Sequence, residues 1–296
     1  MGAQQVRIVT SFPPAYCFTV NVAGDAAEVS NLTSGSAGPH DSQLSAPDLQ
    51  RLRAADLLVV NGLGLEAWLP RAWRALEGGR RPAVVELAAG LDAELIPAAG
   101  VEAGGASRKP EDGPGGLARF NAHVWLDPLL AAHAVTNLLD VLRRADPPRA
   151  ARYEQNAAAY VRRLRQLDEW IRTELGPVKG RRFVTLHDAF PYFVRRYGLS
   201  LAAVIEPAPE VEASPRDVRR VYDAIRRGGV AVIFTEPRSR SSLPRQIARD
   251  TGLTLTELDP LETGPLSADM YEQGMRCNAA SLKAGLQDPA QTRRLQ

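Results

Sequence analysis

The residues most able to bind a metal in this chain are its histidines, of which there are four. Three of them, His40, His123 and His187, come where short apolar, strand-like runs end, and Asp259 closes another such run, LTLTELDPL. In an open α/β sheet, ligands bind outside the carboxyl ends of the strands, so side chains distant in sequence can meet in one crevice. Imidazoles and one carboxylate are typical ligands of a divalent transition metal, zinc above all. The pattern predicts a metal site formed by these four side chains.

The placement of the three histidines carries this prediction, because a single histidine at a strand end is more often structural. His133 is an example of a histidine with an expected structural role. It lies in DPLLAAHAVTNLLDVL, where apolar residues recur at helical spacing, and we expect it to pack or to face water on a helix.

Nearby acids offer alternatives for the fourth ligand. Glu236 in VIFTEP also ends a predicted strand and is a rival of Asp259, although we favour a role in orienting a ligand or packing between lobes. Asp41 and Asp188 directly follow predicted ligands and are expected to cap or orient them. Asp127 is predicted to cap the helix that follows it.

Composition and charge restrict the class of protein. With 296 residues, 45% hydrophobic and 24% charged, the chain is long enough for two globular domains. A net charge of +2 gives no reason to expect a nucleic-acid partner. No apolar run approaches the ~18 residues of a membrane-spanning helix, and the start, MGAQQVRIVTSFPP, leads directly into a predicted strand without a signal peptide. We expect a monomer.

The chain has two cysteines, Cys17 and Cys277, and no CxxC pair. This excludes a cysteine-rich zinc module. Because the two lie in distant elements, two buried thiols are expected more than a disulfide, and the bridge stays open as the alternative.

Strand and helix patterns alternate along the chain in the manner of α/β proteins with parallel sheets. Four strands are expected in the first part, and a second alternating block starts at Arg182. The four are Val6–Thr10, Ala27–Leu32, Leu57–Val60 and Ala83–Leu87. Ser45 is expected to cap the helix of SAPDLQRLRAA, with Pro47 in its first turn.

A long helix is expected between the two blocks, from Pro148 to Leu175, because its apolar residues recur mostly at intervals of three, four or seven. At 1.5 Å per residue it would extend about 40 Å. The expected organisation is therefore an N-terminal lobe (1–146), a rigid linking helix (147–176) and a C-terminal lobe (177–296), with the metal in the cleft between similar βα-repeat lobes. The Gly- and Pro-rich segment 100–116 is expected to be a mobile loop beside this cleft, and we hypothesise that it orders when metal binds.

Five phrases of the chain, in order and over nearly its whole length, resemble a known family. They are GPHDSQLSAPDLQRLRAADLLVVNGLGLEAWL, AHVWLDP, LHDAFPYF, VIFTEP and LDPL. The chain resembles the metal-specific solute-binding proteins of bacterial ABC importers, cluster A-I, which capture zinc or manganese outside the cytoplasmic membrane. Motif by motif, the resemblance implies the same ligands: His40, His123, His187 and Asp259.

The resemblance also implies a function. Members of this family are not enzymes but two-lobed clamps that deliver the metal to a membrane permease, and they are exported as periplasmic or lipid-anchored proteins, so a leader or anchor would be absent from this chain. Where some relatives linked to manganese have a glutamate, this chain has His187. Three nitrogens and one oxygen favour zinc over manganese. Zinc-type relatives often have a histidine-rich loop, whereas segment 100–116 has no histidine.

Two other functions remain compatible with the same residues. Four protein ligands would close a tetrahedral zinc site and leave no position for a catalytic water. If Asp259 did not bind the metal, a zinc hydrolase with an open position would gain support. A metal chaperone or buffer without a permease would share the site.

Overall fold

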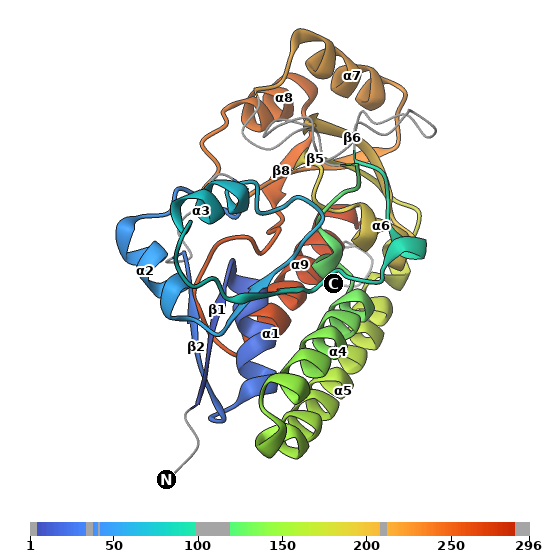
Figure 1. Cartoon of the computed structure of the whole chain (residues 1–296). Helices are drawn as coiled ribbons and strands as arrows, with labels where there is room; N and C mark the ends of the chain where they lie inside the picture. Colours follow the sequence, from blue (N-terminus) through green and yellow to red (C-terminus); the bar gives the residue numbers. More distant parts are fainter. Residues whose placement is uncertain (1–4, 34–37, 41, 99–118, 208–211, 288–296) are drawn as a thin grey trace.

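The computed structural model describes residues 5–33, 38–40, 42–98, 119–207 and 212–287, and these form two α/β lobes (Figure 1). Each lobe contains a parallel four-stranded sheet, with strand order β2-β1-β3-β4 in the first and β6-β5-β7-β8 in the second. The predicted α/β fold with two βα-repeat lobes and a long helix is confirmed. The strands are β1 (Val6–Thr10), β2 (Ala27–Asn31), β3 (Leu57–Val60), β4 (Ala83–Glu86), β5 (Arg182–His187), β6 (Ser200–Glu206), β7 (Val230–Thr235) and β8 (Thr254–Glu257).

Helices connect the strands and cover the sheets. The first part of the chain contains α1 (Pro13–Ala23), α2 (Ala46–Ala54), α3 (Leu69–Ala75), α4 (Pro128–Ala145) and α5 (Ala150–Leu175). The second contains α6 (Pro191–Tyr197), α7 (Pro215–Arg226), α8 (Leu243–Thr251) and α9 (Met270–Leu286). Short 3₁₀ turns are η1 (Asp92–Glu94), η2 (Val124–Leu126), η3 (Pro147–Arg149) and η4 (Gly176–Val178).

The starts of α2 and α7 show how local sequence sets these boundaries. The Ser45 hydroxyl accepts a hydrogen bond from the Asp48 amide, and the Asp48 carboxylate accepts one from the Ser45 amide, 2.7 Å away. Ser214 and Asp217 form the same reciprocal capping box at α7. Both pairs satisfy amides that have no partner inside the helix, and the prediction of Ser45 as a cap is confirmed.

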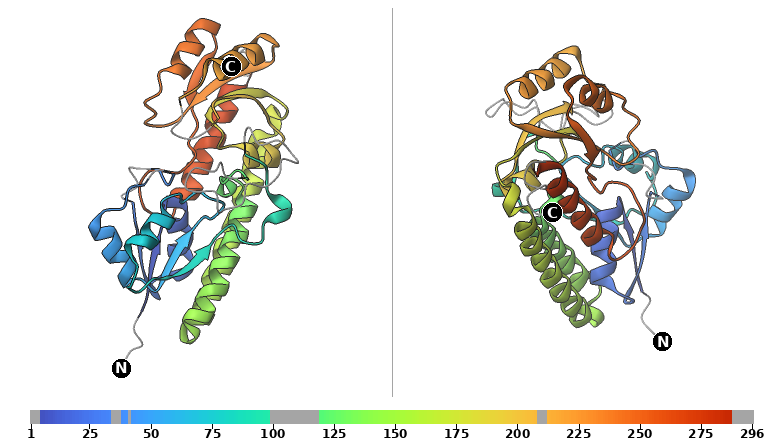
Figure 2. Two further views of the ribbon diagram at one scale, coloured as in Figure 1. Left: turned by 45° about the horizontal axis from the view of Figure 1, so that its top comes forward. Right: turned by 180° about the vertical axis from the view of Figure 1, so that it is seen from behind.

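The long helix α5 lies antiparallel against α4 and extends beside the first lobe (Figures 1 and 2). It begins at Ala150 rather than Pro148, because residues 147–149 form the 3₁₀ turn η3. One face is buried along its whole length, from Tyr153 through Leu164 to Leu175. The division into 1–146, 147–176 and 177–296 stays a prediction.

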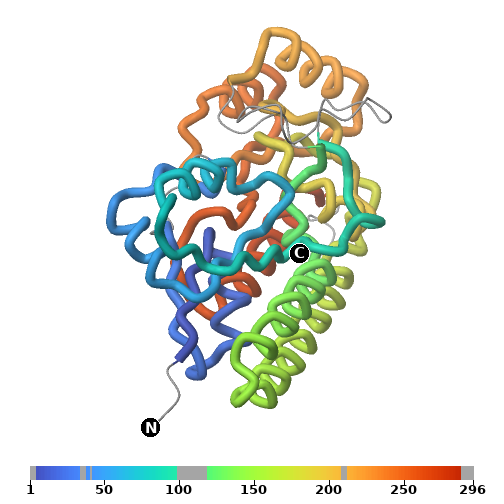
Figure 3. The backbone as a smooth tube through the Cα atoms, viewed as in Figure 1, coloured from blue at the N-terminus to red at the C-terminus, as the bar shows by residue number. Residues whose placement is uncertain are grey.

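The last helix, α9, joins the two lobes a second time. After β8 the chain returns toward α1, where the Asn21 side-chain amide donates to the Ala268 carbonyl at 2.7 Å. Helix α9 then packs against α1 and α5 as well as β7 and β8 (Figure 3). The segment between β8 and α9 is therefore held from both lobes.

Two further expectations can be compared with the structure. Cys17 is buried, Cys277 is exposed, and both are free thiols, so the expected burial of Cys277 is wrong. Within the described residues, no helix is long and apolar enough to cross a membrane.

Candidate metal centre

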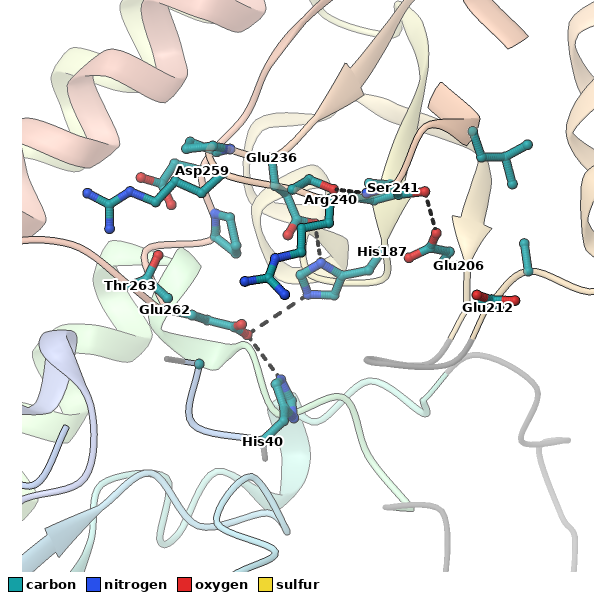
Figure 4. Close-up of a pocket in the computed structure, with 18 of the residues that line it drawn as sticks. His40, His187, Glu206, Glu212, Glu236, Arg240, Ser241, Asp259, Glu262 and Thr263 are labelled. Atoms are coloured by element: carbon teal, nitrogen blue, oxygen red, sulfur yellow. Dashed lines mark hydrogen bonds and ion pairs between the residues drawn. The ribbon is translucent and has the colours of Figure 1, made fainter. Parts of the chain in front are cut away.

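Three histidines and a glutamate meet between the lobes. Glu262 Oε1 lies 3.1 Å from His40 Nε2 and 2.9 Å from His123 Nε2. His187 Nε2 lies 3.1 Å from His123 Nε2 and 3.9 Å from Glu262 Oε1. The ligand atoms of His40, His123 and Glu262 all lie within 4.8 Å of one another, and His187 adjoins this group through His123. Figure 4 shows His40, His187 and Glu262 directed toward one another.

These side chains come from different kinds of backbone. His187 is the last residue of β5, as expected. His123 instead precedes the 3₁₀ turn η2, and His40 follows the end of β2 by nine residues. The expectation that all three histidines stand at strand ends is therefore wrong for His40 and His123, although the structure brings both to the cluster.

Asp259 does not have the position that the sequence suggested. Its Oδ1 accepts a hydrogen bond from the Leu261 amide at 2.7 Å, and its carboxylate lies away from His40 and His187 in Figure 4. Among the described residues, the acid grouped with His40 and His123 is Glu262. Asp259 and Glu262 both follow β8 and are three residues apart. The backbone turn between them determines which carboxylate reaches the histidines.

The orientation of His123 is fixed by Asn121. The Asn121 Oδ1 accepts hydrogen bonds from the His123 amide at 3.0 Å and from its Nδ1 at 2.9 Å. The other end of the Asn121 amide donates to the Asp188 backbone carbonyl at 2.5 Å and to its Oδ2 at 3.1 Å. These partners place the imidazole proton on Nδ1, so that the Nε2 lone pair faces the cluster. Asp188 thereby helps to orient His123 through Asn121, whereas its expected role toward His187, the residue it directly follows, stays a prediction.

His187 is oriented by Glu236, whose carboxylate accepts a hydrogen bond from its Nδ1. A carboxylate on the outer nitrogen of a histidine fixes the ring and leaves Nε2 to face a metal. Glu236 therefore has the supporting position expected for it, on the outer nitrogen of a histidine.

The protonation of the cluster follows from burial and neighbouring charges. Burial lowers the pKa of His123 to about 4, although Glu262 opposes this shift. Burial also opposes charge on His187, but the Glu236 carboxylate outweighs it and raises that pKa to about 9. Burial alone would raise the pKa of Glu262, yet the His123 and His40 imidazoles that face its carboxylate hold it well below the usual range.

At neutral pH this leaves two acceptors, His123 Nε2 and Glu262 Oε1, facing each other at 2.9 Å. Two lone pairs this close repel unless a proton or a cation lies between them. A tetrahedral zinc with ligand bonds of about 2.05 Å has ligand atoms about 3.3 Å apart. Four pairs of the cluster have separations of 2.9 to 3.9 Å, close to this value.

A pocket of about 1040 Å³ opens beside the cluster. Most of its wall belongs to the second lobe, including Glu206, Glu236 and the residues from Arg238 to Leu243, whereas the first lobe contributes Gly38 and His40. The site is therefore buried on its His123 side and opens toward the pocket on the side of the second lobe.

The remaining expectations have simple outcomes. His133 lies on α4 and its Nε2 donates to the Ala89 carbonyl at 2.8 Å, as a structural histidine would. The Asp127 carboxylate accepts from the Leu129 amide at 2.8 Å, so its role as a helix cap is confirmed. Asp41 and segment 100–116 lie outside the described residues.

Comparison with known proteins gives a consistent result. Zinc-binding lipoprotein AdcA of Streptococcus pneumoniae is 31% identical over 259 residues, covering 88% of this chain and 50% of that protein. Iron-binding protein YfeA of Yersinia pestis is 30% identical over 253 residues, covering 84% of this chain and 75% of that protein. The structure of a Zn(II)-bound AdcAII variant of S. pneumoniae superimposes with a TM-score of 0.81 at 28% identity, covering 96% of this chain and 99% of that one.

The chain spans about half the length of the AdcA proteins that it matches. Its residues 8–285 match the family described as ZnuA, zinc-uptake complex component A, periplasmic. The match extends over both lobes and includes every residue of the cluster. The chain belongs to this family of metal-binding solute-binding proteins of ABC importers.

Proposed function

We propose that this protein captures a divalent transition metal outside the cytoplasm, zinc in preference to manganese, and delivers it to the permease of an ABC importer. In this proposal His40, His123, His187 and Glu262 hold the ion. The observation that carries it is the convergence of three imidazole Nε2 atoms and one carboxylate oxygen, with separations of 2.9 to 3.9 Å in the four measured pairs.

The donor set supports zinc. Three neutral imidazoles and one carboxylate satisfy a tetrahedral zinc, whereas manganese prefers shells richer in oxygen. The surroundings of the ligands suit reversible capture, because Asn121 and Glu236 hold two rings in the required orientation before the ion arrives.

Four protein ligands also argue against catalysis. A catalytic zinc keeps one position for water, and a hydrolase needs a free base beside it. Glu236, an acid close to the cluster, is already bonded to His187. A chaperone or buffer would use the same ligands, and membership of the family favours transport.

The proposal is tested by stripping the protein with a chelator and titrating zinc, then manganese, against a competing chromophoric chelator. We expect one zinc per chain in the wild type, much weaker manganese binding, and a loss of zinc affinity of about 100-fold or more in His123→Gln, since removal even of a supporting residue typically costs 10- to 100-fold. The matched control is His133→Gln, which changes a histidine bound to a backbone carbonyl. Equal zinc affinity in the two variants, or no zinc binding by the wild type, would overturn the assignment.

A further inference from the structure

The turn that carries Glu262 has a backbone conformation that L-residues rarely adopt. Leu261, directly before Glu262, has a φ of 63°. Of the residues that the structure describes, only two other non-glycine residues, Leu63 and Arg238, have a positive φ. The left-handed region brings Cβ close to the following carbonyl and is unfavourable for a residue with a side chain. Surrounding contacts must therefore hold Leu261 in place.

The backbone of this turn is held on both sides of Leu261. The Asp259 carboxylate accepts the Leu261 amide at 2.7 Å. Asn278 on α9 accepts from the Asp259 amide at 2.8 Å and donates to its carbonyl at 2.6 Å. From the first lobe, the Trp125 indole donates to the Pro260 carbonyl at 2.8 Å.

The side chain of Leu261 is held as well. It is 2% exposed, and a Cβ added to Gly274 of α9 would overlap with it. The glycine in α9 thus provides the space into which the leucine packs. With the backbone and the side chain of Leu261 both fixed, the next residue can point in one direction, toward His40 and His123.

We propose that Asp259 is a positioning residue for the metal site: its carboxylate stabilises the left-handed conformation of Leu261, which directs Glu262 into the histidine cluster, and Asp259 itself does not contact the ion. This inference rests on the proposed function, because it explains how one ligand of that site is held. It assigns a role to an acid that lines the same pocket and could be taken for a ligand.

The test compares zinc affinities of Asp259→Ala and Asp259→Asn with that of the wild type. Alanine removes the acceptor for the Leu261 amide, and we expect zinc affinity to fall by about 10- to 100-fold. Asparagine retains an oxygen in the same place, and we expect it to restore affinity to within about fivefold of wild type. Glu206→Gln is the control, since it removes one negative charge from the same pocket on a residue bonded to Ser241.

Cobalt(II) absorption separates positioning from ligation. At saturating cobalt, Asp259→Asn should keep the position and intensity of the wild-type ligand-field bands, because the four ligands are unchanged. Thermal unfolding of the metal-free variants establishes that they fold. The effect of Asp259→Ala on zinc affinity should also depend on residue 261. In a Leu261→Gly background, adding Asp259→Ala should lower zinc affinity less than it does in the wild type. The reason is that glycine adopts the left-handed conformation without help.

Wild-type affinity in Asp259→Ala would overturn the inference. So would an asparagine variant as weak as the alanine variant with altered cobalt bands, which would identify Asp259 as a ligand. Absence of zinc binding in the wild type would instead refute the proposed function, so the two failures are distinguishable.

Discussion

The two lobes share a scaffold but contribute differently to the candidate site. Their sheets have the same strand order, and α2 and α7 start with the same capping box. The first lobe supplies His40 and His123, whereas the second supplies His187 and both carboxylates, Glu236 and Glu262. The two lobes thus share their strands and helix starts, whereas the segments after the strands carry different site residues in each lobe.

The site residues of the two lobes also differ in charge. His123 is held neutral by burial, with a pKa of about 4, while its neighbour His187 is held protonated in the metal-free state by Glu236, with a pKa of about 9. The first lobe therefore offers a neutral donor in His123. The second lobe carries the negative charge that compensates a divalent ion.

The largest expected effect contrasts a charged ligand of the second lobe with a neutral ligand of the first. Glu262→Gln should lower zinc affinity by about 100-fold or more, because it removes the carboxylate charge from a buried site. His40→Gln should cost less, since this imidazole is neutral as a ligand and its side chain is 21% exposed. Competition titrations of both variants, with Glu206→Gln as control, check the order. A larger loss in His40→Gln would contradict the asymmetry.

The pH dependence of metal-free stability separates His123 from His187. His123 has a folded pKa of about 4, below the ordinary 6.5, so its contribution is present above pH 6.5 and is lost as pH falls toward 4. His187 has a folded pKa of about 9, so its contribution is present below pH 6.5 and is lost as pH rises to about 9. Each limb amounts to at most about 3 kcal/mol.

Urea unfolding with a chelator present should therefore show a maximum near pH 6.5. His123→Gln should flatten the acid limb, and Glu236→Gln should flatten the alkaline limb. A single monotonic trend that neither variant alters would refute the assigned protonation states.

A related effect concerns the proton that zinc displaces. At pH 7.5 zinc must replace the proton of His187, so we expect zinc binding to release about one proton and affinity to rise about tenfold per pH unit up to pH 9. Glu236→Gln should reduce this release, because the carboxylate that raises the pKa of His187 is gone. Calorimetry in buffers of different ionisation enthalpy measures the proton count. An unchanged count in the variant would show that the proton comes from another group.

The smallest effect tests the shared scaffold. Ser45→Ala and Ser214→Ala each remove a helix cap, one in each lobe, and each should lower the free energy of unfolding by about 1 kcal/mol. Zinc affinity should not change in either, because both caps lie outside the cluster. Unfolding in urea and zinc titration of the two variants provide the measurement, and unequal losses would show that the lobes are not equivalent as scaffolds.

Much of the fold could be predicted because parallel strands buried on both faces are short apolar runs. Leu57–Val60 was predicted with the bounds that the structure shows, and the other strands of the first lobe agree within one residue. Helix α3 begins only at Leu69. Residues before it are drawn into a turn by Glu66, which accepts the Asn61 amide at 2.8 Å.

The site was less predictable where its geometry depends on distant residues. The three histidines could be selected from the sequence, since histidine is rare in this chain. Glu262 could not be preferred over Asp259, because the choice depends on the φ of Leu261 and on Gly274 and Asn278 in α9. The one available signal was a second acid three residues after Asp259 in LDPLET.

The most direct test of the four-ligand site is X-ray absorption of the zinc-loaded protein at the zinc edge. We expect four-coordinate zinc with three imidazoles and one carboxylate oxygen, all at about 2.0 to 2.2 Å. A zinc shell with only two imidazoles, or one completed by water, would contradict a closed capture site. Such a result would favour zinc-dependent hydrolysis instead.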